Sequence, residues 1–129
     1  MKEETQVTAM KALNLTLNKK WFDMIASGVK TEEYREIKPY WINRFVINEY
    51  KKYRTQVVEA DIMATYRGEP LFYAISKDFD IVSANNGYSK DCPNVKWKHE
   101  GITIGEGKPE WGAIPGKKYF ILKIGDLIK

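Results

Sequence analysis

The stretch from Gly28 to Arg35, Gly-Val-Lys-Thr-Glu-Glu-Tyr-Arg, constrains the possible folds of this chain more than any other part of the sequence. It follows a segment with helical patterning, and its own residues favour a strand. Alternate side chains of a strand point to opposite faces, so Glu33 and Arg35 would share one face. Glu32 and Tyr34 would lie on the other, and neither face is apolar. The sequence therefore predicts a strand that lines a polar site, because a strand that only fills a core has an apolar face.

The residues before this stretch predict a strand followed by a short helix. Leu13 to Leu17 alternates apolar and polar residues with period two, which is typical of a strand with one buried face. Asn18 is a favourable N-cap residue, and the apolar residues over 19–27 fall on one side of a helix. Gly28 suits the position after the helix end, where a left-handed backbone costs glycine no Cβ strain. The expected order is strand, helix, glycine and polar strand.

The rest of the chain predicts further short strands and a second helix. Lys38-Pro39 is expected to begin this helix, which would continue to about Glu49. Strands are expected at 60–66, 79–84, 94–104 and 119–124, with turns at 67–70 and 85–87 and a glycine- and proline-rich loop over 105–116. Five or six strands with two or more flanking helices predict an α+β fold built on a small β-barrel.

Length and composition predict one domain without a metal centre. A chain of 129 residues is the size of one domain, expected over 10–129 after a polar, poorly ordered lead-in at 1–9. No apolar run is long enough for a membrane span, and the polar N-terminus lacks the apolar core of an export signal. The single cysteine, Cys92, and single histidine, His99, exclude a Cys/His zinc cluster and fit a reducing cytoplasm. No GxxxxGK[ST] or GxGxxG motif is present, so neither a dinucleotide cofactor nor triphosphate hydrolysis is expected.

Positive charge is concentrated in the half of the chain that contains the polar strand. The whole chain has 21 Lys/Arg and 17 Asp/Glu, a net charge of +4. Between Lys11 and Arg54 there are ten Lys/Arg and five Asp/Glu. This surplus suits an anionic partner such as RNA, and it also suits a solvated, lysine-rich surface.

The spacing Gly28-x-Lys30-x-x-Glu33-x-Arg35 resembles the G-x-K-x-x-E-x-R signature of ASCH domains. The family has this signature after a short first strand and one helix, as expected here. The resemblance covers nearly the whole chain, and it implies a PUA-like β-barrel over 10–129 and an RNA-related function.

The side chains of this motif suit recognition of a nucleotide. The ammonium of Lys30 can donate hydrogen bonds to a phosphate, a carbonyl or a developing oxyanion. Glu33 can accept a hydrogen bond from an exocyclic amine, and Arg35 can bind a phosphate or a base edge through two N–H groups. The alternatives are a surface lysine and a structural ion pair between Glu33 and Arg35.

The resemblance also implies a possible enzyme. Some small bacterial ASCH proteins resemble amidohydrolases that remove the acetyl group of N4-acetylcytidine, using the motif lysine, a threonine three residues later and a glutamate from elsewhere. Here Lys30 is present, but Glu33 occupies the threonine position. Glu33 would then activate the water, and Glu110, next to Trp111 in the loop, is a candidate for the separate glutamate. A solvated loop glutamate is the alternative for Glu110.

Further candidates for binding lie outside the motif. Aromatic side chains can stack on bases, small polar residues in a turn can bind a base, and Arg44 can contact phosphates. These candidates are Trp41, Arg44, Tyr88, Ser89, Lys90 and Trp111. Packing, a simple turn and a solvated helix face are their structural alternatives.

Three functions follow from these residues. The first is binding of RNA or a nucleotide in a basic pocket formed by Lys30, Glu33 and Arg35. The second is an amidohydrolase acting on a modified pyrimidine nucleoside, and the third is a protein-interaction module with an aromatic surface. No membrane partner is expected, and the sequence predicts no oligomeric state.

Overall fold

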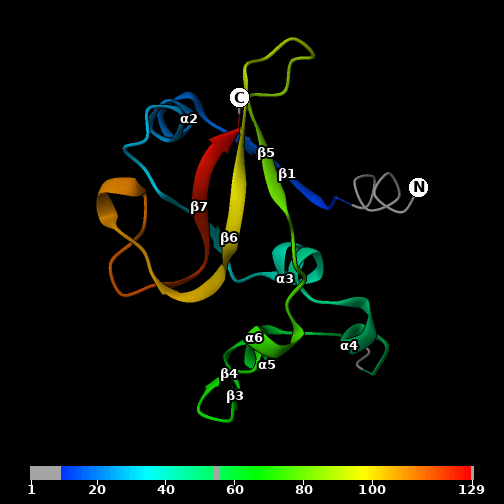
Figure 1. The fold of residues 1–129 in the computed structure, drawn as a ribbon. Helices are drawn as coiled ribbons and strands as arrows, with labels where there is room; N and C mark the ends of the chain where they lie inside the picture. The colour runs from blue at the N-terminus through cyan, green and yellow to red at the C-terminus, as the bar shows by residue number, and fades with distance from the viewer. Residues whose placement is uncertain (1–9, 54–55, 129) are drawn as a thin grey trace, which may run out of the picture. The chain divides into compact units, whose positions relative to one another are not determined.

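The computed structural model describes residues 10–53 and 56–128 (Figure 1). The lead-in predicted at 1–9 lies outside these residues. The described chain contains a five-stranded sheet in the order β1-β5-β6-β7-β2 and a two-stranded sheet, β3-β4. The sheet strands are β1 (Ala12–Leu17), β2 (Glu32–Glu36), β3 (Thr65–Tyr66), β4 (Glu69–Pro70), β5 (Ile81–Asn86), β6 (Asn94–Glu106) and β7 (Lys118–Ile128).

Short helices complete the described chain and confirm the predicted α+β class. They are α2 (Lys19–Ala26), α3 (Pro39–Phe45), α4 (Asn48–Tyr53), α5 (Glu59–Met63), α6 (Phe72–Ile75) and the 3-10 helix η1 (Pro109–Trp111). No helix of the described residues is long and apolar enough to cross a membrane. The described residues divide into two compact units. The first comprises 10–33, 78–101 and 123–128, and the second comprises 34–53, 56–77 and 102–122.

The first unit is built on the parallel pair β1–β5. Leu13 lies opposite Val82 and Leu15 opposite Ala84, and all four side chains are buried. β6 continues this layer antiparallel to β5, with the buried Trp97 opposite Val82. The alternation of buried and exposed residues predicted for 13–17 is therefore confirmed, and that predicted for 94–104 is confirmed over 94–100, because each strand turns one face to the core. Residues 101–104 are all half-buried and do not alternate.

Helix α2 begins and ends at the residues predicted. The side chain of Asn18 accepts a hydrogen bond from the backbone N–H of Trp21, at 3.2 Å. Phe22 and Ile25 are the buried residues of the helix. Beyond the C-cap residue, Gly28 has a φ of 84°, in the left-handed region that side chains with a Cβ seldom adopt.

The second unit has a core of aromatic side chains. The ring centroids of Phe45 and Phe120 are 5.1 Å apart, and those of Phe72 and Phe120 are 4.9 Å apart. All three side chains are fully buried. Edge-on and tilted ring contacts of this kind stabilise a core beyond the burial of apolar area.

The helix predicted from Pro39 to about Glu49 is shorter than expected. α3 ends at Phe45, because Val46 is extended and pairs with Ser76. The backbone N–H of Lys77 donates to the carbonyl of Phe45 at 2.8 Å. These bonds satisfy backbone groups that a continuing helix would otherwise use, and a separate helix, α4, begins at Asn48.

The strand predicted at 60–66 is mostly wrong. Residues Glu59–Met63 form α5, and the buried carboxylate of Asp61 accepts a hydrogen bond from the backbone N–H of Val58 at 2.8 Å. This bond stabilises the first turn of a helix. The turn predicted at 67–70 is confirmed as the hairpin between β3 and β4, in which Arg67 and Gly68 both have positive φ, as a tight hairpin turn requires.

The single histidine lies in β6 of the first unit and is half-buried. The ring of His99 contacts Phe79 edge-on at 6.0 Å, and among the described residues its buried Nδ1 has no hydrogen-bond partner. Burial lowers the pKa of His99, whereas the carboxylates of Asp78 and Glu100 act in the opposite direction.

We expect Gly28→Ala to lower the free energy of unfolding by about 1–2 kcal/mol, the cost of a left-handed backbone for a residue with a Cβ. A Cβ there has no neighbour within 4 Å, so the cost is one of backbone conformation alone. Urea unfolding measures it. Gly105→Ala is the control, because its φ is not left-handed and its Cβ would meet Ile121 Cδ1 at 3.4 Å. Equal losses in both variants would contradict the assigned helix end.

His99 predicts a pH dependence of stability. Because its pKa is lowered in the folded protein, the unfolded chain binds the proton at higher pH, and stability falls as pH drops below about 6.5. For one proton the slope cannot exceed about 1.4 kcal/mol per pH unit. When urea unfolding is followed from about pH 8 to about pH 5, on either side of that value, the stability of His99→Gln should change less with pH than that of the wild type. If stability changes with pH equally in the two proteins, His99 is not the source of the pH dependence.

Candidate ligand site at the buried Lys30–Glu33 pair

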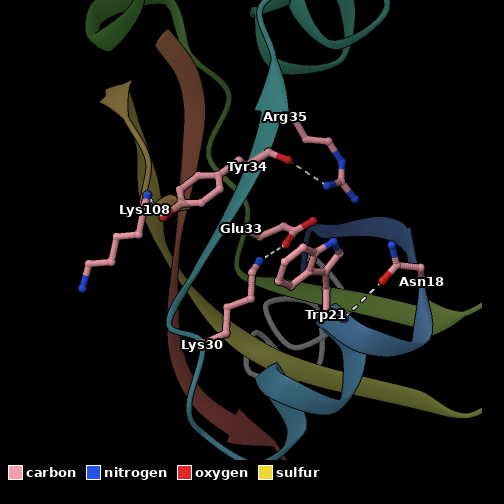
Figure 2. A network of polar contacts seen from close by, with 7 residues as sticks. All are labelled: Asn18, Trp21, Lys30, Glu33, Tyr34, Arg35 and Lys108. Atoms are coloured by element: carbon pink, nitrogen blue, oxygen red, sulfur yellow. Dashed lines mark hydrogen bonds and ion pairs between the residues drawn. The ribbon is translucent and has the colours of Figure 1, made fainter. Parts of the chain in front are cut away.

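An ion pair between Lys30 and Glu33 is buried inside the first unit. The two residues are 1% and 4% exposed, and Lys30 Nζ donates a hydrogen bond to Glu33 Oε1 (Figure 2). Removing two charges from water costs several kcal/mol per ion, which their attraction only partly offsets. Lysine and glutamate are almost never fully buried unless they are paired, as these two are.

The end of α2 places Lys30 in this position. After the left-handed Gly28, the backbone N–H of Lys30 donates to the carbonyl of Met24 at 3.0 Å. The carbonyl of the next residue, Thr31, accepts a hydrogen bond from the backbone N–H of Ile124 at 3.1 Å. The chain is therefore held on both sides of Lys30, and Glu33 follows on β2.

The indole of Trp21 lies beside the ammonium of Lys30. Lys30 Nζ is 5.5 Å from the centroid of the Trp21 ring, and Lys20 Nζ is 4.7 Å from it. Figure 2 shows Trp21 on α2 next to the pair, with Asn18 at the start of the same helix. The half-buried ring thus contacts two cations, each by an interaction worth about 0.5–1 kcal/mol at exposed sites.

Sequence analysis did not identify Trp21 as part of this site. Its position in the run 21–25, Trp-Phe-Asp-Met-Ile, indicates helical core packing. Only Phe22 and Ile25 of this run are buried. The lysine directly before Trp21 was the available signal for a cation beside this ring. The orientation of the helix, which the sequence does not give, decides which of its apolar residues contacts Lys30.

The other face of β2 in the first unit is also paired. Lys123 Nζ donates to Glu32 Oε2, and the side chains of these residues are 44% and 16% exposed. The strand is therefore polar on both faces, as predicted. Breaking the half-exposed pair Glu32–Lys123 should cost less than breaking the buried pair, because solvent screens its charges and can hydrate the one left behind.

In the second unit, the motif arginine belongs to an aromatic cluster. The guanidinium of Arg35 donates to the carbonyl of Tyr34 at 2.9 Å, and its Cζ is 5.1 Å from the centroid of the Trp41 ring. Arg44 Cζ is 5.7 Å from the same ring. Arg35, Trp41 and Arg44 were predicted from the sequence as binding residues on separate grounds, and both guanidinium groups lie beside the Trp41 ring.

The loop beside β2 in the second unit is fixed by Tyr34. Its hydroxyl accepts a hydrogen bond from the backbone N–H of Lys108 at 2.9 Å. Lys117 donates to Glu36 at 2.7 Å, and this hydrogen bond, together with the charge of Lys117, lowers the pKa of Glu36. Trp111 is only 9% exposed, with Lys108 Nζ 4.5 Å from its ring centroid, whereas Glu110 is exposed.

The remaining candidates lie in a turn of the first unit. Tyr88, Ser89 and Lys90 are exposed and follow Gly87, which has a φ of 92°. Within the described residues, no side-chain hydrogen bond or ion pair joins these three residues to Lys30 or Glu33. Among the predicted site residues, Lys30 and Glu33 are the most buried.

We compared the chain with protein-family models, with curated proteins and with solved structures, and none of the three comparisons found a match. Function is therefore argued from the chemistry of the residues. The buried pair presents a cationic donor and an anionic acceptor next to an indole ring. This combination can bind a polar, planar molecule that offers both an acceptor and a donor.

Breaking the buried pair should destabilise the protein strongly. We expect Lys30→Met and Glu33→Gln each to cost about 3–5 kcal/mol in urea unfolding, because each change removes one partner of a buried charged pair. The double variant should lose less than the sum of the two, by about 1–3 kcal/mol. Lys123→Met, which breaks the half-exposed pair on the other face of β2, is the control and should cost less than about 1 kcal/mol. Losses equal to this control would show that Lys30 and Glu33 do not depend on each other.

Proposed function

We propose that this protein binds RNA or a nucleotide as an ASCH-like domain, with the Lys30–Glu33 pair contacting the base. The observation that carries the proposal is the burial of both charges, at 1% and 4% exposure, on a strand that is polar on both faces. An apolar pair of similar volume would be at least as stable at this position. Retention of the charges is therefore best explained by recognition of a polar ligand.

The chemistry of the pair favours a pyrimidine with a donor beside an acceptor. Glu33 would accept a hydrogen bond from an exocyclic amine, as carboxylates do with cytosine N4. Lys30 would donate to a ring carbonyl or ring nitrogen. The indole of Trp21, next to Lys30, would contact the face of the base. Cytosine presents this combination of groups, whereas uracil replaces the amine with a second carbonyl.

The ASCH-like assignment rests on four motif residues and on their context. Gly28 ends α2, Lys30 and Glu33 form the buried pair, and Arg35 lies two residues further along β2. The strand, helix and motif occur in the order expected for the family, and a five-stranded mixed sheet suits a PUA-like barrel. We propose this fold family and a single functional domain over 10–129 on these grounds.

A second candidate is hydrolysis of an N4-acylated cytidine. The observation that favours it is the direct hydrogen bond between Lys30 and Glu33 away from bulk water, where an acid–base pair acts efficiently. Lys30 would stabilise the oxyanion of the acyl group while Glu33 takes a proton from the attacking water. The carbon–nitrogen bond then breaks, the proton passes to the departing N4 amine, and cytidine and a carboxylic acid result.

Binding and turnover can be tested with the same proteins. Cytidine should bind the wild type more tightly than uridine by about tenfold in calorimetry, the discrimination expected when one buried polar group loses its partner. Glu33→Gln should abolish this preference, and Lys30→Met should weaken both nucleosides. Lys98→Met, which changes an exposed lysine of β6, is the control and should bind like the wild type. Equal binding by Glu33→Gln and the wild type would refute the proposed contact.

Turnover separates the two candidates. Incubation with N4-acetylcytidine, followed by chromatography, should yield cytidine and acetate only if the pair is catalytic, and Lys30→Met should then abolish the product. Cytidine binding without any product would retain the binding function and exclude the hydrolase.

A further inference from the structure

Two arginines and two aromatic rings form a surface cluster in the second unit, which we call the α3 arginine surface. It consists of Arg35, Tyr40, Trp41 and Arg44. Arg44 donates to the hydroxyl of Tyr40 at 3.0 Å, and its Cζ lies 5.8 Å from the Tyr40 ring centroid and 5.7 Å from that of Trp41. Arg35 Cζ is 5.1 Å from the Trp41 centroid. Two guanidinium groups therefore share one indole.

The rings of this surface are held rigidly. Trp41 stacks on the buried Phe45, with centroids 5.5 Å apart and an angle of 27° between the planes. Tyr40 meets Trp41 edge-on at 4.8 Å and is 57% exposed. The aromatic core of the unit thus fixes Trp41, and Trp41 fixes Tyr40. A ligand that binds here loses little by ordering the surface, because the rings are already in place.

Arg44 retains most of its capacity to bind an anion. A guanidinium has five N–H donors, and within the described part of the chain Arg44 forms one side-chain hydrogen bond, to Tyr40, and no ion pair. Its half-buried position and its contacts with two rings limit its motion. A planar, preoriented guanidinium of this kind suits a phosphate, which it can bind through two parallel hydrogen bonds.

The surrounding charge is positive. From Lys38 to Tyr53 the sequence has four Lys/Arg and one acidic residue, Glu49. Lys51 donates to the carbonyl of Asn43 at 2.9 Å, and burial, together with the neighbouring charge of Lys77, lowers the pKa of Lys51. The segment from Lys38 to Tyr53 therefore carries more cations than anions, which suits an anionic partner.

Helix geometry alone explains only part of this arrangement. Arg44 lies in the last turn of α3, where a cation interacts favourably with the helix dipole. This accounts for Arg44, whereas Arg35 reaches the same ring from β2. An acidic peptide would use the two arginines without the exposed face of Tyr40. Single-stranded nucleic acid would contact the arginines through its phosphates and the exposed face of Tyr40 through a stacked base.

We propose that the α3 arginine surface binds single-stranded nucleic acid, with Arg44 and Arg35 on the phosphates and Tyr40 stacked on a base. The proposal rests on contacts within the second unit and does not depend on the function proposed for the Lys30–Glu33 pair. It would bind any sequence, because phosphates and base faces are common to all nucleotides.

The test uses a fluorescein-labelled oligouridine about ten nucleotides long, within the range of known single-strand sites. Anisotropy is measured between about 50 and 200 mM salt. Each phosphate contact contributes a slope of about −0.7 to log K against log salt. Arg44→Gln should make the slope less steep by about 0.7 and weaken binding several-fold. Arg44→Lys should retain the slope, because the charge remains, and lose part of the affinity.

Tyr40 provides an independent readout. Tyr40→Leu should weaken binding about tenfold, in the range expected for loss of one stacked base, and leave the salt slope unchanged. Lys98→Gln removes one exposed charge from the first unit and should change neither quantity. Binding of the wild type that does not depend on salt, or Arg44→Gln behaving like Lys98→Gln, would overturn the proposal. Equally tight, salt-dependent binding of labelled polyglutamate would overturn it in favour of an acidic peptide.

Lys30→Met separates this site from the function proposed above. It should weaken nucleoside binding, whereas the salt slope for oligouridine and the loss caused by Arg44→Gln should stay the same as in the wild-type background. If the wild type binds oligouridine through Arg44 but no nucleoside, the nucleoside function fails and the α3 arginine surface stands. If instead the wild type binds nucleosides, and the Arg44 and Tyr40 variants bind oligouridine as the wild type does, the nucleoside function stands and the α3 arginine surface is refuted.

Discussion

The buried ion pair between Lys30 and Glu33 is the interaction on which the candidate function depends. Two charges that are almost completely removed from water require each other, because either one alone would carry an uncompensated desolvation cost. The indole of Trp21 adds a favourable contact to the ammonium. The pair thus provides a donor and an acceptor at fixed positions, and the proposed recognition of a base rests on this arrangement.

The end of helix α2 makes this pair possible. Asn18 caps the first turn, Gly28 adopts the left-handed conformation after the last, and the backbone N–H of Lys30 returns to Met24. Local chain chemistry therefore directs Lys30 inward before β2 begins. If α2 continued through the motif, Lys30 and Glu33 would be neighbours three residues apart on the surface of a helix. Instead, Glu33 lies on strand β2.

The second unit fixes its surface groups by a different means. A core of phenylalanine rings orders Trp41 through its stack on Phe45, and Trp41 in turn contacts two guanidinium groups. Apolar burial, rather than ion pairing, thereby sets the geometry of the cations. The motif residues of the first unit instead depend on a buried pair of charges. The chain uses both ways to hold polar groups in place.

By itself, the sequence determined the elements whose patterns are local. These are the period-two strand at 13–17, the capped helix that ends before Gly28, the polar strand β2 and the solvent-exposed face of β6. These depend on residues near one another in the chain, so propensity and capping suffice. Only the tertiary structure decided that α3 stops at Phe45, that 59–63 is helical and that Lys30 and Glu33 are buried. It also decided that Trp21 lies beside Lys30 and that Arg35 and Arg44 share the Trp41 ring. The physical reason is that burial and backbone pairing with distant segments, such as Val46 with Ser76, outweigh local preferences of a fraction of a kcal/mol per residue.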